Sequence, residues 1–173
     1  MLTLYSKIVN LPIIELENQS RLASVLDVVV DPKNGRILGL IAKVGSILPR
    51  DQLVAARDIS QILPTTILVV DAERLTAIDE VVRVNELYKK HYTLFGKKVV
   101  TENGKLLGKI NDYLIDDEAL SLVKIYVRHL ISDRIIPYSA VVKIDDKAVT
   151  VKDDFEAISV SNESKTVVDM EQC

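Results

Sequence analysis

The chain repeats its own apolar pattern at an offset of 85 residues, and this internal repeat is the feature that most restricts its fold. Residues 11–31 align without a gap to residues 96–116, so that Asp27 falls on Asp112. The alignment continues through the rest of each copy once three residues are deleted from the second one. Self-similarity at a fixed offset indicates copies of one structural unit. The sequence therefore predicts two small tandem repeats.

Each copy consists of short segments rich in Val and Ile that are divided by turn signals, which is typical of an all-β sandwich or barrel. The segment 32–35 (Pro-Lys-Asn-Gly) is a strong turn signal because Pro fixes φ and Asn-Gly tolerates a positive φ. The corresponding corner at 116–119 (Asp-Asp-Glu-Ala) has no glycine, so we expect a looser turn there. The strands expected in the first copy are 11–16, 24–30, 36–44, 52–55 and 67–70.

The predicted fold class is all-β with minor helix, in which two tandem small β-barrels pack together. Between the copies, apolar residues such as Leu75, Ile78 and Val82 recur at spacings of three and four, which indicates an amphipathic helix or two short ones. The last residues are polar and lack periodicity, which indicates a disordered acidic tail. The predicted boundaries are a first repeat at 1–71, a helical linker at 72–91, a second repeat at 92–155 and the tail at 156–173.

Charge and cysteine usage restrict the setting in which the chain works. Its formal net charge of −3 is not the strongly basic balance of a non-specific nucleic-acid binder. The single cysteine, Cys173, permits no internal disulfide, which fits a reducing, cytoplasmic location. The longest apolar runs are far shorter than the roughly 20 residues that span a bilayer, so we expect no membrane insertion.

Three segments of the chain carry a resemblance to a known family. An Asn-Gly turn at 103–104 precedes the strand segment 108–112 (Gly-Lys-Ile-Asn-Asp), and the segment 135–141 reads Ile-Ile-Pro-Tyr-Ser-Ala-Val. They resemble the turn, the G-x-[VI]-x-D strand and the apolar-apolar-Pro-[WY]-x-x-[VI] stretch of the PRC-barrel family. The first copy departs from this pattern, since Ala23 replaces the strand glycine and alanines at 55–56 replace the Pro-Tyr pair. The chain thus resembles a tandem PRC-barrel protein.

The resemblance implies a module that docks other macromolecules and has no shared catalytic residues. We therefore expect a non-catalytic adaptor or scaffold that binds another protein. The alternative is an RNA-processing or ribosome-associated factor that binds rRNA or a ribosomal protein, as in one branch of the family. A ribosome maturation factor of that branch carries one barrel after a different N-terminal domain, whereas this chain has two repeats, which favours the adaptor. A homo-oligomer stays open.

Two repeated carboxylate pairs, Asp27 with Asp31 and Asp112 with Asp116, are the most regular polar feature of the chain. Such pairs suggest metal binding or acid–base chemistry. On a strand, however, side chains four residues apart are separated by about 13 Å, which is too far for both to bind one ion. We expect instead that one Asp of each pair accepts backbone N–H groups at a strand corner and that the other caps the hairpin turn.

The sequence offers little for a metal, a cofactor or catalysis. His91 and His129 are the only histidines and Cys173 the only cysteine, so three convergent zinc ligands are not expected. The acidic clusters lack the glycine-containing spacing of a calcium loop. No phosphate-binding glycine loop or nucleophile elbow is present. We therefore predict no metal, no cofactor and no enzymatic activity.

A lysine cluster is the first candidate contact surface. Lys97, Lys98, Lys105 and Lys109 place four positive charges within thirteen residues, opposed only by Glu102. If these lysines converge, they form a basic face for phosphate or rRNA with a salt-dependent affinity. The alternative is a solvated face that guards an edge strand against aggregation.

An apolar loop is the second candidate contact surface. The segment 45–50 is longer than its counterpart in the second copy and contains Ile47, Leu48 and Arg50. Apolar side chains on an exposed loop indicate a docking site for a partner. The alternative is a loop that packs against the second barrel.

Overall fold

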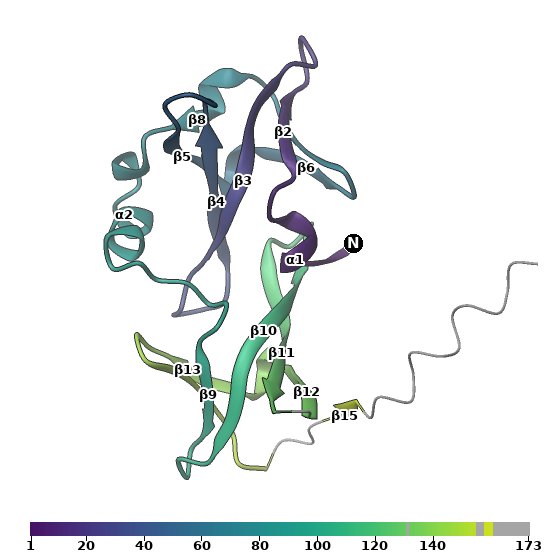
Figure 1. Cartoon of the computed structure of the whole chain (residues 1–173), viewed down its shortest axis with the longest axis vertical. Helices are drawn as coiled ribbons and strands as arrows, with labels where there is room; N and C mark the ends of the chain where they lie inside the picture. Colours follow the sequence, from purple (N-terminus) through teal and green to yellow (C-terminus); the bar gives the residue numbers. More distant parts are fainter. Residues whose placement is uncertain (131, 155–157, 161–173) are drawn as a thin grey trace, which may run out of the picture.

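The computed structural model describes residues 1–130, 132–154 and 158–160, and it contains two β-sheets that lie one above the other along the longest axis (Figure 1). The first sheet comprises β2 (Pro12–Glu15), β3 (Arg21–Val30), β4 (Ile37–Val44), β5 (Arg50–Ala55), β6 (Ile59–Leu63), β7 (Thr66–Val69) and β8 (Leu75–Thr76). Its strand order is β6-β7-β2-β3-β4-β5-β8, with β2 parallel to β7 and antiparallel to β3.

The second sheet repeats this connectivity. It comprises β9 (Lys98–Thr101), β10 (Leu106–Asp116), β11 (Ser121–His129), β12 (Ser132–Pro137), β13 (Val141–Ile144), β14 (Ala148–Val151) and β15 (Ile158–Val160). Its order is β13-β14-β9-β10-β11-β12-β15, with β9 parallel to β14 and antiparallel to β10. The all-β fold and the two repeats predicted from the sequence are therefore confirmed.

Helical structure is limited to short segments outside the two sheets. The α-helices are α1 (Tyr5–Ile8) and α2 (Val82–Lys89), and the 3₁₀ turns are η1 (Ala56–Asp58), η2 (Ala72–Arg74), η3 (Ile78–Glu80) and η4 (Tyr138–Ala140). Val84 and Leu87 of α2 pack on Val29 and Ile41 of the first sheet, so this helix covers one part of that sheet.

Two strands lie in segments that the sequence analysis assigned to the linker and the tail. β8 starts at Leu75, inside the expected helical linker, and pairs with β5. β15 starts at Ile158, inside the expected disordered tail, and pairs with β12. The two short strands lie at equivalent edges of the two sheets. Local apolar periodicity could not indicate these strands, because their pairing depends on distant segments. The rest of the expected tail lies outside the described residues.

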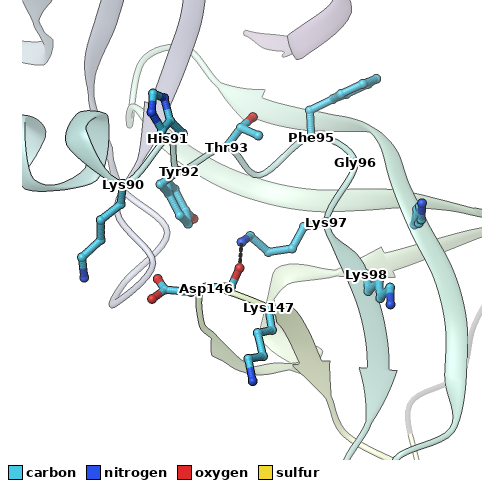
Figure 2. Close-up of a pocket in the computed structure, with 11 residues that line it drawn as sticks. Lys90, His91, Tyr92, Thr93, Phe95, Gly96, Lys97, Lys98, Asp146 and Lys147 are labelled. Carbon is cyan, nitrogen blue, oxygen red and sulfur yellow. Dashed lines mark hydrogen bonds between the residues drawn. The ribbon is translucent and has the colours of Figure 1, made fainter.

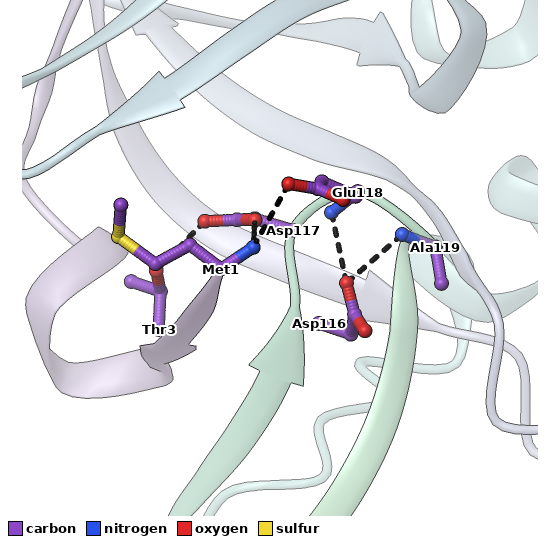
Figure 3. Close-up of polar contacts among 6 residues, drawn as sticks. All are labelled: Met1, Thr3, Asp116, Asp117, Glu118 and Ala119. Atoms are coloured by element: carbon purple, nitrogen blue, oxygen red, sulfur yellow. Dashed lines mark hydrogen bonds and ion pairs between the residues drawn. The ribbon is translucent and has the colours of Figure 1, made fainter.

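The N-terminal strand joins the sheet of the other repeat. β1 (Leu2–Leu4) pairs antiparallel with the end of β10, in the register Leu2 to Asp116. At this position the N-terminal ammonium group forms an ion pair with Asp117, whose other carboxylate oxygen accepts a hydrogen bond from the Thr3 hydroxyl at 3.2 Å (Figure 3). Residues 1–71 were expected to form the first repeat, so the addition of β1 to the second sheet was not predicted.

The hairpin turns of the two repeats meet in the middle of the molecule. The backbone N–H of Ile37 donates to the carbonyl of Leu120 at 2.8 Å, and the N–H of Leu122 donates to the carbonyl of Gly35 at 2.8 Å. Gly35 has a φ of +70°, and a Cβ atom there would lie 2.5 Å from Cζ of Tyr138. The turn glycine thus serves both the hairpin and the contact with the second repeat.

A single large core connects the two sheets. Its buried side chains include Val28 and Ile37 from the first repeat and Ile115 and Leu122 from the second. Tyr113 is fully buried, and its ring stacks on that of Tyr5 with the centroids 4.5 Å apart. Because apolar surface of each repeat is removed from water by the other, the two repeats stabilise each other.

Candidate functional site

The first Asp of each repeated pair lies at a β-bulge. The register between β3 and β4 shifts at Asp27, and the register between β10 and β11 shifts at Asp112. A bulge leaves a backbone N–H without a ladder partner. At both bulges the carboxylate accepts this group, since Val28 N donates to Asp27 Oδ1 at 2.8 Å and Tyr113 N donates to Asp112 Oδ1 at 2.9 Å.

The second Asp of each pair caps a hairpin turn. Asp31 Oδ1 accepts the backbone N–H of Lys33 at 3.0 Å. Asp116 Oδ1 accepts the N–H groups of Glu118 and Ala119, each at 3.0 Å (Figure 3). The donations from Ala119 and Glu118 lower the pKa of Asp116. The prediction that these four carboxylates support the backbone is confirmed.

Three of the four lysines predicted as a cluster line one hollow. Lys97, Lys98 and Lys109 border a cavity of about 570 Å³ together with Lys90 and Lys147 (Figure 2). We call this cavity, lined by these five lysines, the lysine hollow. Lys98 and Lys109 are direct cross-strand partners. Like charges in such a pair repel, so this part of the sheet favours a bound anion.

Lys97 is fixed in the lysine hollow. Its Nζ donates to the backbone carbonyl of Asp146 at 3.1 Å and lies 4.9 Å from the ring centroid of Tyr92 (Figure 2). Burial lowers the pKa of Lys97, while the charge of Asp146 opposes that effect. Asp146 is also the only carboxylate among the residues that line the hollow, so its charge balance is positive.

The fourth predicted lysine lies elsewhere. Lys105 follows the turn between β9 and β10, where its backbone N–H donates to the Thr101 hydroxyl at 3.2 Å, and it does not line the hollow. Lys90 and Lys147 take part in the lining and were not predicted from the sequence. Lys147 precedes β14, whose Ala148 is the parallel partner of Lys98. A pairing between segments about 50 residues apart leaves no local signal in the sequence.

The apolar loop between β4 and β5 is exposed. Ile47 and Leu48 have 91% and 82% of their surface accessible, so the loop does not pack against the second repeat. Arg50 lies at the base of the loop as the first residue of β5, opposite Val44. The structure therefore brings the two apolar residues together at the tip and leaves the arginine beside them on the strand.

The second repeat has an exposed apolar residue at the equivalent hairpin. Leu130 follows β11, and 84% of its surface is accessible. β4 and β11 point to opposite ends of the molecule (Figure 1). The tip of the β4–β5 hairpin and Leu130 thus lie far apart, although the repeat gives them equivalent positions.

The described residues contain no group of three or more His, Cys, Asp or Glu side chains that could hold a metal ion. No helix among them is both long enough and apolar enough to cross a lipid bilayer.

The comparisons with known proteins agree with the repeated connectivity. No curated protein matches the chain. The family model of the PRC-barrel domain matches twice, over residues 3–77 and again over residues 88–158. These two matches correspond to the two sheets, including β8 in the first and the start of β15 in the second. Because the two matches together cover most of the chain, the chain belongs to the PRC-barrel domain family and contains two copies of the domain in tandem.

Proposed function

We propose that this chain is a non-catalytic adaptor that docks a partner protein through the tip of the β4–β5 hairpin. The observation that supports this most directly is the exposure of Ile47 and Leu48, the two most exposed large apolar side chains of the first repeat. Exposure of large apolar side chains to water is unfavourable. Burial of these side chains in an apolar pocket of a partner would therefore stabilise the complex. The occupant of the tip is therefore a folded protein with an apolar pocket.

The rigidity of the support favours this role. Six cross-strand residue pairs between β4 and β5 hold the base of the tip, from Gly39 with Ala55 to Val44 with Arg50. A side chain presented by a rigid hairpin loses little conformational entropy on binding. Arg50 beside the tip adds a donor that can pair with a carboxylate on the rim of the partner's pocket.

Site-specific photocrosslinking in the native host tests this proposal. A benzoylphenylalanine at position 47 or 48 should yield a discrete crosslinked product with one protein. The matched control is the same probe in place of Val142, which is an apolar residue of β13 with 50% of its surface accessible. The proposal predicts no discrete product at position 142. The same products at both places, or none at the tip, would contradict it.

A second function, binding of RNA phosphates by the lysine hollow, is supported by a separate observation. Five lysines surround one carboxylate in the hollow, and the Tyr92 ring lies beneath Lys97. Lysines that converge on one cavity attract phosphates by releasing counterions. Phe95, which also lines the hollow and has 46% of its surface accessible, offers a base a stacking partner.

Lysine substitutions test this second function. Lys98→Gln and Lys109→Gln should each weaken binding of a labelled single-stranded RNA and reduce the salt slope by about 0.7, while Lys105→Gln should change neither. Fluorescence anisotropy between low and moderate salt measures both quantities. Equal effects of all three substitutions would reject the lysine hollow as an RNA site.

A further inference from the structure

A second hollow lies where the first sheet meets α1 and α2. Its volume is about 360 Å³, within the range of small-ligand sites. Three side chains that are almost completely buried, Val29, Ile41 and Leu87, provide an apolar surface. Asp27 contributes a carboxylate to the lining. We call this cavity the Asp27 hollow.

The carboxylate in this hollow has no cationic partner in the part of the chain that the structure describes. Asp27 Oδ1 accepts hydrogen bonds from the Tyr5 hydroxyl at 3.0 Å and from Val28 N at 2.8 Å. No hydrogen bond to Oδ2 and no ion pair with Asp27 is found among the described residues. Burial raises the pKa of Asp27, and both groups that oppose this rise, Val28 N–H and the Tyr5 hydroxyl, are neutral. A charge that is partly removed from water without a counterion gains from pairing with a cation.

In the second repeat, the equivalent carboxylate has hydrogen-bond donors that Asp27 does not have. Its equivalent carboxylate, Asp112, accepts the backbone N–H of Ser6 at 3.1 Å on Oδ1 and the Ser6 hydroxyl at 2.6 Å on Oδ2. The residue that the 85-residue offset places opposite Ser6 is His91. His91 lines the Asp27 hollow but forms no hydrogen bond with Asp27. The donor position that Ser6 fills in one repeat is therefore open in the other.

Aromatic side chains complete the lining. The hollow is bordered by Tyr5, Tyr88 and Tyr92, which belong to α1, α2 and the segment after α2. Tyr5 stacks on Tyr113 and Phe95, and Lys97 lies over the Tyr92 ring, so Tyr88 is the lining ring that offers its face to a cation. An aliphatic chain that ends in a cation suits the whole lining, because its methylene groups gain from the apolar surface while its charge gains from the carboxylate.

We propose that the Asp27 hollow binds an alkylammonium or alkylguanidinium group, with the charge on Oδ2 of Asp27 and the aliphatic stem against Val29, Ile41 and Leu87. This site is separate from the β4–β5 tip and does not depend on the proposed adaptor function. The group can belong to a small free amine or to a lysine or arginine side chain of a partner protein.

Titration of the full-length protein, followed by ¹⁵N-resolved NMR, tests the proposal. The probes are agmatine, the capped tripeptide Gly-Arg-Gly, and its neutral counterpart with citrulline in place of arginine. Agmatine or the arginine peptide should shift the amide signals of residues that line the Asp27 hollow in a saturable way, and the citrulline peptide should not. Tighter binding of the peptide indicates a protein side chain as the natural ligand, and tighter binding of agmatine indicates a free amine.

A conservative pair of variants provides the control. Asp27→Asn keeps a side-chain oxygen that can accept from Tyr5 and Val28, so the fold should persist, and it should weaken binding at least about tenfold. Asp112→Asn changes the equivalent carboxylate outside the hollow and should leave binding unchanged. The proposal is overturned by equal binding to the Asp27→Asn variant, by equal binding of the citrulline peptide, or by the absence of saturable shifts with both charged probes.

Discussion

At the scale of single residues, the equivalent aspartates Asp27 and Asp112 have different surroundings in the two repeats. Asp27 and Asp112 both accept the N–H of the next residue at a bulge, but only Asp112 also receives the two donors of Ser6. The backbone role therefore explains why the residue recurs. At Asp27, where the donors of Ser6 have no counterpart, burial raises the pKa of the carboxyl group.

This difference predicts a pH dependence of stability. Because burial raises the pKa of Asp27 in the folded state, the folded protein holds this proton at a higher pH than the unfolded chain does. Ionisation of Asp27 therefore lowers the free energy of unfolding as pH rises from the unfolded pKa through the folded one. In Asp27→Asn this loss is absent, so its stability relative to the parent protein should increase as pH rises from the unfolded pKa of about 4, and it should level off once Asp27 is ionised in the folded state as well.

Urea denaturation of both proteins across this pH range measures the difference. Titrating groups that do not interact with Asp27 are common to both proteins and cancel in the comparison. A stability difference that is constant, or that decreases as pH rises, would contradict the assigned cause.

Gly108 carries a second prediction at this scale. Its φ is +138°, and a Cβ atom would lie 2.3 Å from the carbonyl oxygen of Arg128. Gly108→Ala should lower the free energy of unfolding by about 3 kcal/mol, because it combines backbone strain with a clash against a fixed strand. Gly104→Ala is the matched control, since Gly104 also has a positive φ of +81° but nothing within 4 Å of its Cβ position. The control should cost only about 1 kcal/mol, and equal losses in urea denaturation would reject the clash.

At the scale of secondary-structure elements, β1 connects the N-terminus to the second sheet. Removal of residues 1–4 deletes the pairing with Leu114–Asp116 and should lower the free energy of unfolding by about 2 kcal/mol. Backbone amides at the end of β10 should then exchange faster in hydrogen-exchange experiments. N-terminal acetylation is the control, because it removes the charge that pairs with Asp117 and keeps the strand. If acetylation costs as much as truncation, the strand pairing contributes little.

The elements that local sequence could predict are those with a local cause. The Pro-Lys-Asn-Gly turn at 32–35 was predicted, and the carboxylates Asp31 and Asp116 were expected to cap the two hairpins, because a turn depends on the conformational preferences of a few neighbouring residues. The pairing of β1 with β10 and the approach of Tyr138 to Gly35 depend on contacts between distant segments. No periodicity within one segment records such contacts.

The candidate contact surfaces also combine features with a local cause and features that depend on distant segments. Exposure of Ile47 and Leu48 was predicted as one of two alternatives, because the loop signal is local but its surroundings are not. Convergence of Lys97, Lys98 and Lys109 was likewise only one of two alternatives, and the parallel pairing of β14 with β9 adds Lys147 to them.

At the scale of the whole molecule, the two repeats form one structural unit. They share a core, and β1 of the first repeat joins the sheet of the second. Backbone hydrogen bonds connect their hairpin turns. The chain should therefore unfold in a single cooperative transition. A fragment of residues 88–158 loses Tyr5 from the face of Tyr113 and should melt at a clearly lower temperature than the full chain. Calorimetry of both proteins tests this, and equal midpoints would show that the repeats are independent.

The same architecture places the two apolar hairpin ends at opposite ends of one cooperative body (Figure 1). A rigid body of this kind can hold a partner in a fixed position relative to a second contact, which is the property that a scaffold needs. The β4–β5 tip is the contact through which we propose that the protein docks another protein.

The most direct test is quantitative affinity capture from native host lysate, with and without nuclease, that compares the parent protein with a variant carrying Ile47→Ser and Leu48→Ser. Both substitutions lie on an exposed loop, so the fold should be unaffected. We expect a protein partner that survives nuclease treatment and is lost with the variant. Partners that disappear with nuclease, or that the variant captures equally well, would rule out docking through the tip.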